Sequence, residues 1–336
     1  MYLSMPKFRK GVPVTLAYFE MDSAQKENEL LKPFPSWELN DDRSCINLQS
    51  VQSMEIDTAG VMWVLDGVRI KNNVHCPPKL MFFDLKYNGL LIFTYTFPNE
   101  ISLQKGGFLN DIVIDESGGG YAYITDNSNI DPGLIVYSRK KNRVWKIRDR
   151  SMFPELWAAN FIVDKVRVEA LAPIDGIALS PKPLDPFANR TVFYTSLTGF
   201  DIFALGTEIL KNEDLCLSDR WRTHVKFVGE KQGQTDGMMI DSKGNLYYTL
   251  LPLYGVGRWN IKEKFGSARI IDINAQEMVW PDGFAMDQKG YLYLISNSAF
   301  KYVNPETELK LTPDIKFRVF KLATSTRSYL YNDGHV

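Results

Sequence analysis

Five polar side chains stand at corresponding places in a repeated pattern, a sixth follows the outgoing strand of the last copy, and together they could bind a cationic ligand. Three are aspartates that each precede a glycine, and the others are one serine and two asparagines. Carboxylate and amide oxygens that converge on an aromatic-lined hollow suit a small cation that carries an aromatic ring. The ammonium would pair with one carboxylate while the ring stacks on an aromatic side chain. The residues are Ser53, Asn110, Asp175, Asp236, Asp282 and Asn297.

The alternative interpretation of each aspartate is structural. Aspartate before glycine is a common residue at the entry to a strand, where its side chain accepts hydrogen bonds from nearby backbone N–H groups. For any single aspartate this role competes with ligand binding. The ring of polar residues taken as a group favours a binding site.

The elements that position these residues are repeated β-hairpins, clearest at residues 235–249 and 281–294. In each copy a small polar residue leads into an apolar run, an Asp-x-x-Gly turn follows, and the next strand is rich in Tyr and Leu. Glycine provides the positive φ of a tight turn, and aromatic and branched residues suit a packed pleated surface. Three further copies lie at residues 53–64, 110–118 and 175–180, the last with its outgoing strand at 192–195.

The spacing of the copies predicts a β-propeller. Their turns lie at positions 57, 115, 180, 241 and 287, so successive copies are 58, 65, 61 and 46 residues apart. A repeat of this length with at least two strands per copy is typical of a propeller with one blade per repeat, whose innermost strands line a central channel. We therefore expect an all-β fold, a six-bladed β-propeller whose blade at the N-terminus is incomplete.

The two ends of the chain are expected to supply the sixth blade. Residues 1–20 read as two strands without the innermost one, and residues 315–322 alternate with period two and could close the ring. We predict a single propeller domain over residues 1–336, with a disordered tail from about 323 to 336. Residues 149–172 are expected to cross the surface above the channel.

Composition excludes several classes of partner. The chain has 336 residues, 39 basic and 40 acidic, a net charge of -1, and no basic run longer than residues 139–141. This distribution gives no electrostatic footprint for nucleic acid or an anionic membrane. No stretch approaches the roughly 18 to 20 apolar residues that span a bilayer. The expected partner is a small molecule.

No signature of a cofactor, a metal site or a nucleophile is present. His75, His224 and His335 are too scattered for a zinc cluster, and neither H-E-x-x-H nor G-x-S-x-G occurs. The glycines at 118–120 lie between strands, whereas a phosphate-binding loop would open onto a helix. The catalytic residues are therefore unknown. Any enzymatic role would need one of the three aspartates as a base, with its pKa raised by burial.

Five ordered motifs resemble the yellow and major royal jelly protein family. They are P-K-F-R-K-G-V-P-V-T-L at 6–16, W-V-L-D at 63–66, C-P-P-K-L leading to F-D-L within 76–85, L-N-D-I-V-I-D at 109–115 and V-K-F-V-G at 225–229. The resemblance covers nearly the whole chain. It implies a secreted six-bladed propeller, from a family found mostly in insects. Its members serve in cuticle pigmentation and nutrition and as salivary binders of serotonin-like amines, and some convert dopachrome.

The resemblance carries expectations about the ends and the site. Family chains begin with a signal peptide and about one further strand before the first motif, so this sequence resembles an N-terminally truncated member of a secreted protein. Asn297 lies where similar amine-binding members have an asparagine that contacts the ligand. Two departures are Ala59 and Arg258, where similar proteins usually have cysteine.

Two covalent modifications are expected in a secreted protein. Cys45 precedes the inner strand of the second blade and Cys76 follows the next strand back, so both lie at one end of that blade and could form a disulfide. The alternative is two buried free thiols. Cys216, in a polar loop, is expected to be unpaired. Asn189 begins an Asn-Arg-Thr glycosylation sequon at a boundary between a loop and a strand.

Two other functions remain as alternatives. One uses the same aspartates as metal ligands, and the other needs no binding site. Residues 236–241 and 281–283 also resemble the gluconolactonase group of six-bladed propellers, whose Asp and Asn side chains hold a divalent cation that activates a lactone. That group needs a glutamate from its first blade, and the stretch that would carry it is absent here. The remaining alternative is a storage or interaction protein whose channel is filled by side chains.

Overall fold

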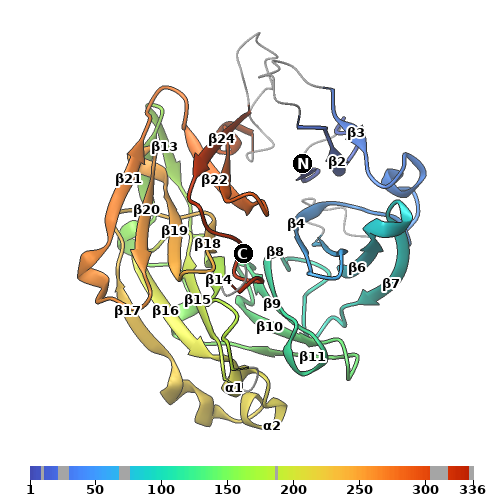
Figure 1. Cartoon of the computed structure of the whole chain (residues 1–336), viewed down its shortest axis with the longest axis horizontal. Helices are drawn as coiled ribbons and strands as arrows, with labels where there is room; N and C mark the ends of the chain where they lie inside the picture. The colour runs from blue at the N-terminus through green and yellow to red at the C-terminus, as the bar shows by residue number, and fades with distance from the viewer. Residues whose placement is uncertain (9–10, 22–29, 68–75, 186–187, 303–316, 333–336) are drawn as a thin grey trace. The chain divides into compact units, whose positions relative to one another are not determined.

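The computed structural model describes residues 1–8, 11–21, 30–67, 76–185, 188–302 and 317–332. They belong to two compact units, Met1–Ile112 and Val113–Val336. Strands are the main regular elements of the described chain, and the helices are short (Figure 1). No helix in this part of the chain is long and apolar enough to cross a membrane. The expectation of a single domain over residues 1–336 stays a prediction.

The first unit contains two antiparallel sheets. A three-stranded sheet has the order β1 (Tyr2–Ser4), β2 (Leu16–Tyr18) and β3 (Lys32–Pro33). A four-stranded sheet has the order β4 (Val51–Ile56), β5 (Val61–Asp66), β6 (Lys79–Asp84) and β7 (Leu90–Thr96). Two 3-10 turns, η1 (Glu38–Asn40) and η2 (Leu85–Tyr87), precede β4 and β7. The core of the unit is apolar, with Leu16, Phe34, Leu48, Val64 and Phe83 among its buried side chains.

Besides a two-stranded hairpin, the second unit contains four sheets of three or four strands, and within each sheet the strands follow one another in chain order. The first has β8 (Leu109–Asp115), within which the unit begins, β9 (Tyr121–Asp126), β10 (Gly133–Ser138) and β11 (Arg143–Ile147). The second has β14 (Ile174–Leu179), β15 (Thr191–Ser196), β16 (Asp201–Gly206) and β17 (Lys226–Glu230). The third has β18 (Met238–Ile240), β19 (Asn245–Leu250), β20 (Gly255–Asn260) and β21 (Arg269–Ile273), and the fourth has β22 (Trp280–Met286), β23 (Tyr291–Asn297) and β24 (Arg318–Ala323).

Shorter elements connect these sheets. A separate hairpin is formed by β12 (Asn160–Val163) and β13 (Val166–Glu169). The α-helices are α1 (Thr207–Leu210), α2 (Glu213–Cys216) and α3 (Ala299–Tyr302). The 3-10 turns are η3 (Ser117–Gly119), η4 (Arg150–Met152), η5 (Leu156–Ala158), η6 (Asp219–His224), η7 (Leu251–Leu253) and η8 (Phe265–Ser267). Six sheets of three or four antiparallel strands confirm the predicted fold class, an all-β six-bladed β-propeller.

The aspartate at the turn organises three of the hairpins. Asp241 accepts hydrogen bonds from the backbone N–H groups of Lys243 (3.0 Å) and Asn245 (2.8 Å) and from the Tyr247 hydroxyl (3.2 Å). Gly244 completes the turn with φ +86°, a value that favours glycine. The same arrangement recurs at Asp57 with Trp63 and at Asp287 with Tyr293. The local pattern thus fixes both the turn and the register of the two strands.

The prediction that the two chain ends share one blade is wrong for the described residues. β24 pairs along its whole length with β23, from Tyr291 opposite Ala323 to Ser296 opposite Arg318. β1 pairs with β2, which pairs with β3. Pairing with the strand nearest in sequence closes the shorter loop and so costs less conformational entropy. Period-two alternation in β24 identified a strand, but it carried no information about the strand's partner.

The expectation of a disordered tail is also wrong as far as residue 332, and residues 333–336 lie outside the described chain. Tyr329 and Leu330 are buried, with 1% and 2% of their surface exposed. The Tyr329 carbonyl accepts hydrogen bonds from the Lys182 N–H (3.0 Å) and the Arg190 guanidinium (3.0 Å). Its hydroxyl accepts one from the Ile114 N–H (3.0 Å). These contacts fasten the C-terminal segment to the ends of β8 and β14.

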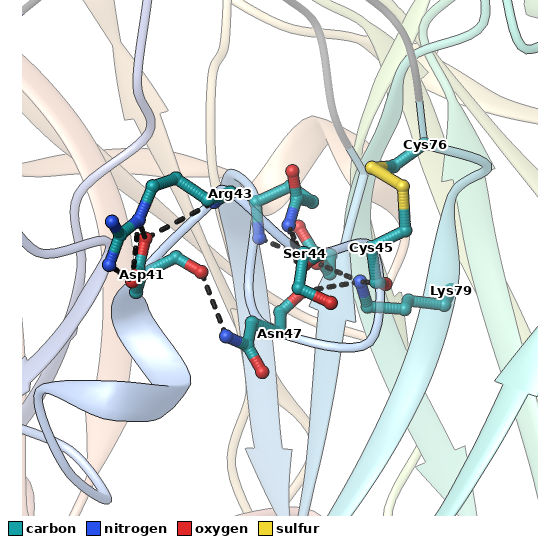
Figure 2. Close-up of a disulfide and its surroundings, with 9 residues drawn as sticks. Asp41, Arg43, Ser44, Cys45, Asn47, Cys76 and Lys79 are labelled. Atoms are coloured by element: carbon teal, nitrogen blue, oxygen red, sulfur yellow. Dashed lines mark hydrogen bonds and ion pairs between the residues drawn. A yellow bond between two sulfur atoms is a disulfide. The ribbon is translucent and has the colours of Figure 1, made fainter.

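The predicted disulfide is confirmed. Cys45 and Cys76 are bonded, with their Cα atoms 5.2 Å apart and a sequence separation of 31 (Figure 2). The Lys79 ammonium donates to the carbonyl oxygens of Cys45 (2.6 Å) and Asn47 (2.5 Å), which holds the same loop. Cys216 is free, as expected, but it lies in α2 and is buried. Burial raises the pKa of its thiol to about 11.

Removing the disulfide should destabilise the protein measurably. Replacing Cys45 and Cys76 by serine frees a loop of 31 residues in the unfolded chain. The chain-entropy relation then gives a loss of about 3 to 4 kcal/mol in the free energy of unfolding. Urea denaturation of the double variant measures it, with Cys216→Ala as the control for loss of a buried thiol that closes no loop. Equal midpoints for the double variant and the wild type would contradict this role.

Candidate functional site

The second unit brings the three predicted aspartates onto adjacent strands. β18 lies beside both β14 and β22. A Cβ atom added to Gly176 would lie 2.6 Å from the carbonyl oxygen of Asp236, and one added to Gly237 would lie 2.2 Å from that of Asp282. Real Cβ atoms do not approach other atoms so closely. The glycine after each of the first two aspartates therefore lets the next strand approach, and Asp175, Asp236 and Asp282 follow one another across three strands.

Asp236 lies against an aromatic group. Its carboxylate accepts a hydrogen bond from the indole N–H of Trp280 (2.7 Å), and its backbone N–H donates to the Thr249 hydroxyl (2.9 Å). The Trp280 ring stacks on Phe300, with centroids 5.6 Å apart and an interplanar angle of 21°. Phe161 lies on the same cluster, with its centroid 6.2 Å from that of Trp280. The Asp236 carboxylate therefore lies next to a stack of aromatic rings.

Asp282 is held by Asn297, and the two predicted site residues contact each other directly. The Asn297 amide donates to the Asp282 carboxylate (2.6 Å), while its oxygen accepts from the Ala299 N–H (2.8 Å) at the start of α3. Asp282 keeps some surface exposure, but the protein atoms around it raise the pKa of its carboxyl to about 6, against the opposing effect of the Asn297 hydrogen bond. The Asn297 amide therefore holds the Asp282 carboxylate in place.

Asp175 is more fully buried than Asp282. Only 4% of its surface is exposed, and its carboxylate accepts a hydrogen bond from the Asn127 amide (2.7 Å). Asn127 also donates to the Pro173 carbonyl (3.2 Å). Sequence reasoning missed Asn127, although it directly follows β9 much as Asn297 ends β23. An asparagine at the end of an outgoing strand was the signal that could have found it.

Ser53 and Asn110 belong to the first unit, and their place in the binding site stays a prediction. The Ser53 hydroxyl donates to the carboxylate of Asp111 (2.8 Å), which also accepts from the Ile112 N–H (2.8 Å). The acidic neighbour of Ser53 is therefore Asp111, one residue beyond the predicted Asn110. Asn110 itself is half-buried in β8.

The hairpin within the predicted surface excursion packs on the aromatic cluster. Phe161 of β12 is buried against Trp280, together with Val163 and Leu251. At the turn of the hairpin, Asp164 forms an ion pair with Lys301 of α3. Its backbone N–H donates to the Tyr254 hydroxyl (2.9 Å). The hairpin and α3 therefore both pack against the aromatic cluster around Trp280.

Comparison with known proteins now identifies the family. The sequence pattern described as "Major royal jelly protein" matches residues 49–327. The chain belongs to the major royal jelly protein family. It is 26% identical over 340 residues to protein yellow of Drosophila pseudoobscura pseudoobscura, covering 97% of this chain and 59% of that protein. Against protein yellow of Drosophila melanogaster it is 25% identical, covering 97% of this chain and 61% of that protein. This royal jelly family member thus spans about three fifths of the length of these relatives.

Solved structures show the same fold at low identity. The luciferin-regenerating enzyme superposes on this family member with a TM-score of 0.50 and 11% identity, covering 83% of this chain and 80% of that one. A gluconolactonase from Xanthomonas campestris gives a TM-score of 0.43 and 12% identity, covering 73% and 68%. At these identities the likeness concerns the fold alone, and the second similarity is too low to support a hydrolase function.

Two other predictions concern this family member's surface and metal chemistry. Within the described ranges, no three His, Cys, Asp or Glu side chains lie close enough together to hold a metal ion. His75 and His335 lie outside those ranges. Asn189 is exposed, two residues before β15, so an oligosaccharide there would project into solvent. Its glycosylation stays a prediction.

Proposed function

We propose that this royal jelly family member binds a small aromatic amine or a catechol-derived molecule beside Asp236 and Asp282, in the predicted central channel. The observation that carries the proposal is the contact between Asp236 and Trp280, whose ring is stacked on Phe300. A ligand ammonium would pair with the carboxylates, and its ring would pack on Phe300, the partly exposed ring of the aromatic cluster. Aromatic rings contribute large contact area with a defined geometry, and they also attract cations.

The same site supports a proposed reaction in pigment chemistry. Conversion of dopachrome requires a base that removes a proton from the ring. A carboxylate with a pKa near the working pH is suited to that task, and burial raises the pKa of Asp282 to about 6. We propose Asp282 for this role. Loss of dopachrome colour, followed against a boiled control, tests it.

Secretion is part of the proposal. Disulfides persist in oxidising compartments and are rare in the cytosol. The Cys45–Cys76 bond and the exposed Asn189 sequon support an extracellular protein that carries a glycan. Expression in insect cells, followed by digestion with a glycosidase that removes N-linked glycans, should lower the apparent mass of the secreted protein. The Asn189→Gln variant should show no such change.

Calorimetric titration with serotonin, dopamine and octopamine tests binding directly. We expect saturable heat with at least one of them at pH 7.5. Because burial raises the pKa of Asp282 to about 6, affinity should be full above about pH 7 and should fall as the pH drops through 6. The ligand's own ammonium stays protonated over this range, as a primary amine does. Absence of heat with all three amines would overturn the proposal and favour a storage or interaction protein.

A further inference from the structure

Four lysines of the described chain are buried, and three of them, Lys79, Lys146 and Lys231, lie in or directly after a strand. Lys79 and Lys146 are fully paired. Lys79 and Lys146 are 2% and 6% exposed. Lys79 contacts three oxygens, the carboxylate of Asp66 (3.1 Å) and the two carbonyls of the disulfide loop. Lys146 contacts the carboxylate of Asp126 (2.8 Å) and the carbonyl (2.6 Å) and carboxylate (3.1 Å) of Asp131. Three acceptors, at least one of them charged, suit the three protons of an ammonium group.

Lys231 has a different environment. It directly follows β17, is 3% exposed, and donates to two neutral oxygens, the Thr195 hydroxyl (2.6 Å) and the Gly199 carbonyl (3.0 Å). Asp66 and Asp126 end the second strand of the other two sheets, whereas in this sheet that position is Ser196 and Thr195 is the residue before it. The Thr195 hydroxyl gives its own proton to the Asp201 carbonyl (2.7 Å), so toward Lys231 it can only accept. Two acceptors match the two protons of a neutral amine, whose lone pair stays free.

The acidic groups that face Lys231 do not replace the missing carboxylate. They are Glu155, from the segment before η5, and Asp201 of β16. The Glu155 carboxylate accepts from the backbone N–H groups of Phe200 (3.2 Å) and Asp201 (3.3 Å). Burial raises the pKa of Asp201 against the opposing attraction of Lys231, and both Glu155 and Asp201 act to raise the pKa of Lys231. Desolvation nevertheless dominates at Lys231 and lowers the pKa of its ammonium to about 7.

We propose that Lys231 is a site of covalent modification by small aldehydes, held as a neutral amine by Thr195 and Gly199. The lone pair of its Nζ attacks the carbonyl carbon of the aldehyde, and a C–N bond forms in the carbinolamine. The carbonyl oxygen then leaves as water with the two amine protons, which gives an imine. No oxidant or further reactant is consumed. This site is separate from Asp236 and Asp282, and the proposal does not depend on amine binding.

Reductive alkylation of the folded protein tests the proposal. The protein is treated at pH 7 with acetaldehyde and cyanoborohydride, digested, and ethylation of each lysine is followed by mass spectrometry. At this pH about half of Lys231 would be neutral, against less than about 0.1% of a lysine with the ordinary pKa. Lys79 and Lys146 are equally buried controls in the same molecule. We expect Lys231 to react at least about 10-fold faster than either; an equal or slower rate would overturn the proposal.

A substitution and a pH series separate this chemistry from local opening of the chain. Thr195→Asp places a carboxylate where the hydroxyl contacts Lys231 Nζ, so it should reduce ethylation of Lys231 to the rate of Lys146. Thr195→Val supplies no charge and should leave Lys231 reactive. If Thr195→Asp does not fold, the ethylation rates of the three lysines in the wild type still test the proposal. From pH 6 to 9 the rate at Lys231 should level off above about 7.5, whereas the rate at Lys146 keeps rising. Parallel pH profiles would contradict the inference.

Discussion

The Asp282→Asn variant should bind the amine at least about 30-fold more weakly than the wild type at pH 7.5. The substitution keeps the shape of the side chain and an oxygen that can accept from the Asn297 amide, which lies 2.6 Å from the carboxylate. What it removes is the negative charge. Truncating one partner of a buried charge pair costs about 2 to 5 kcal/mol, and each 1.4 kcal/mol is tenfold in affinity. Calorimetric titration of both proteins measures the difference.

The matched control is Asp272→Asn, the same change on an exposed residue of β21. It should bind like the wild type. The wild type should also lose affinity as the pH falls through about 6, whereas Asp282→Asn should show no such step, because the group that titrates there is gone. Equal affinities for Asp282→Asn and Asp272→Asn would place the ligand elsewhere.

Asn297→Ala distinguishes positioning from direct contact with the ligand. Its hydrogen bond lowers the pKa of Asp282 against the larger effect of burial, so losing it should move the midpoint of the pH dependence above 6. Affinity at pH 7.5 should fall less than in Asp282→Asn, by about 10-fold for the loss of one hydrogen bond to a charged group. A variant that loses affinity with an unmoved midpoint would indicate that Asn297 contacts the ligand instead.

The second large effect is a loss of stability on substitution of Gly237. The same substitution at Gly283, which also follows an aspartate of the repeat, should have little effect. Gly237→Ala should lower the free energy of unfolding by about 3 kcal/mol, at the upper end of what overpacking a folded interior costs. The new methyl group would meet the backbone carbonyl oxygen of Asp282 at 2.2 Å, and a strand backbone cannot turn aside as a side chain can. Because the strand that moves carries Asp282, amine binding should weaken as well.

Gly283→Ala is the control, since it also follows an aspartate of the repeat. Its nearest neighbour would be a methyl carbon of Ile295 at 3.8 Å, an ordinary contact distance. Neither glycine has a left-handed φ, so the comparison isolates the approach of the neighbouring strand. We expect Gly283→Ala to unfold at nearly the wild-type urea concentration. Similar midpoints for the two variants would mean that β18 and β22 are not packed as closely as described.

Sequence reasoning predicted a binding site from these residues, and its alternative interpretation gave each aspartate local hydrogen bonds. It placed Asp236 and Asp282 at strand entries, where an aspartate commonly binds nearby backbone N–H groups. Each instead accepts from a side chain far along the chain, Trp280 for Asp236 and Asn297 for Asp282. The separations are 44 and 15 residues, beyond any local motif. A pattern of residue types identifies a polar position without identifying what fills its hydrogen bonds.

The amino-acid sequence by itself determined the repeated hairpins, the blade-like sheets and the Cys45–Cys76 disulfide. These depend on contacts within a few residues, such as the hydrogen bonds of Asp241 across its own turn, or on cysteines at one end of one sheet. Only the tertiary structure decided that β24 pairs with β23, that Tyr329 is buried, and that Asp236 lies against Trp280. These contacts join segments remote in sequence. Their partners are chosen by the competition among all strands and apolar surfaces of the folded chain, and no single segment encodes the outcome of that competition.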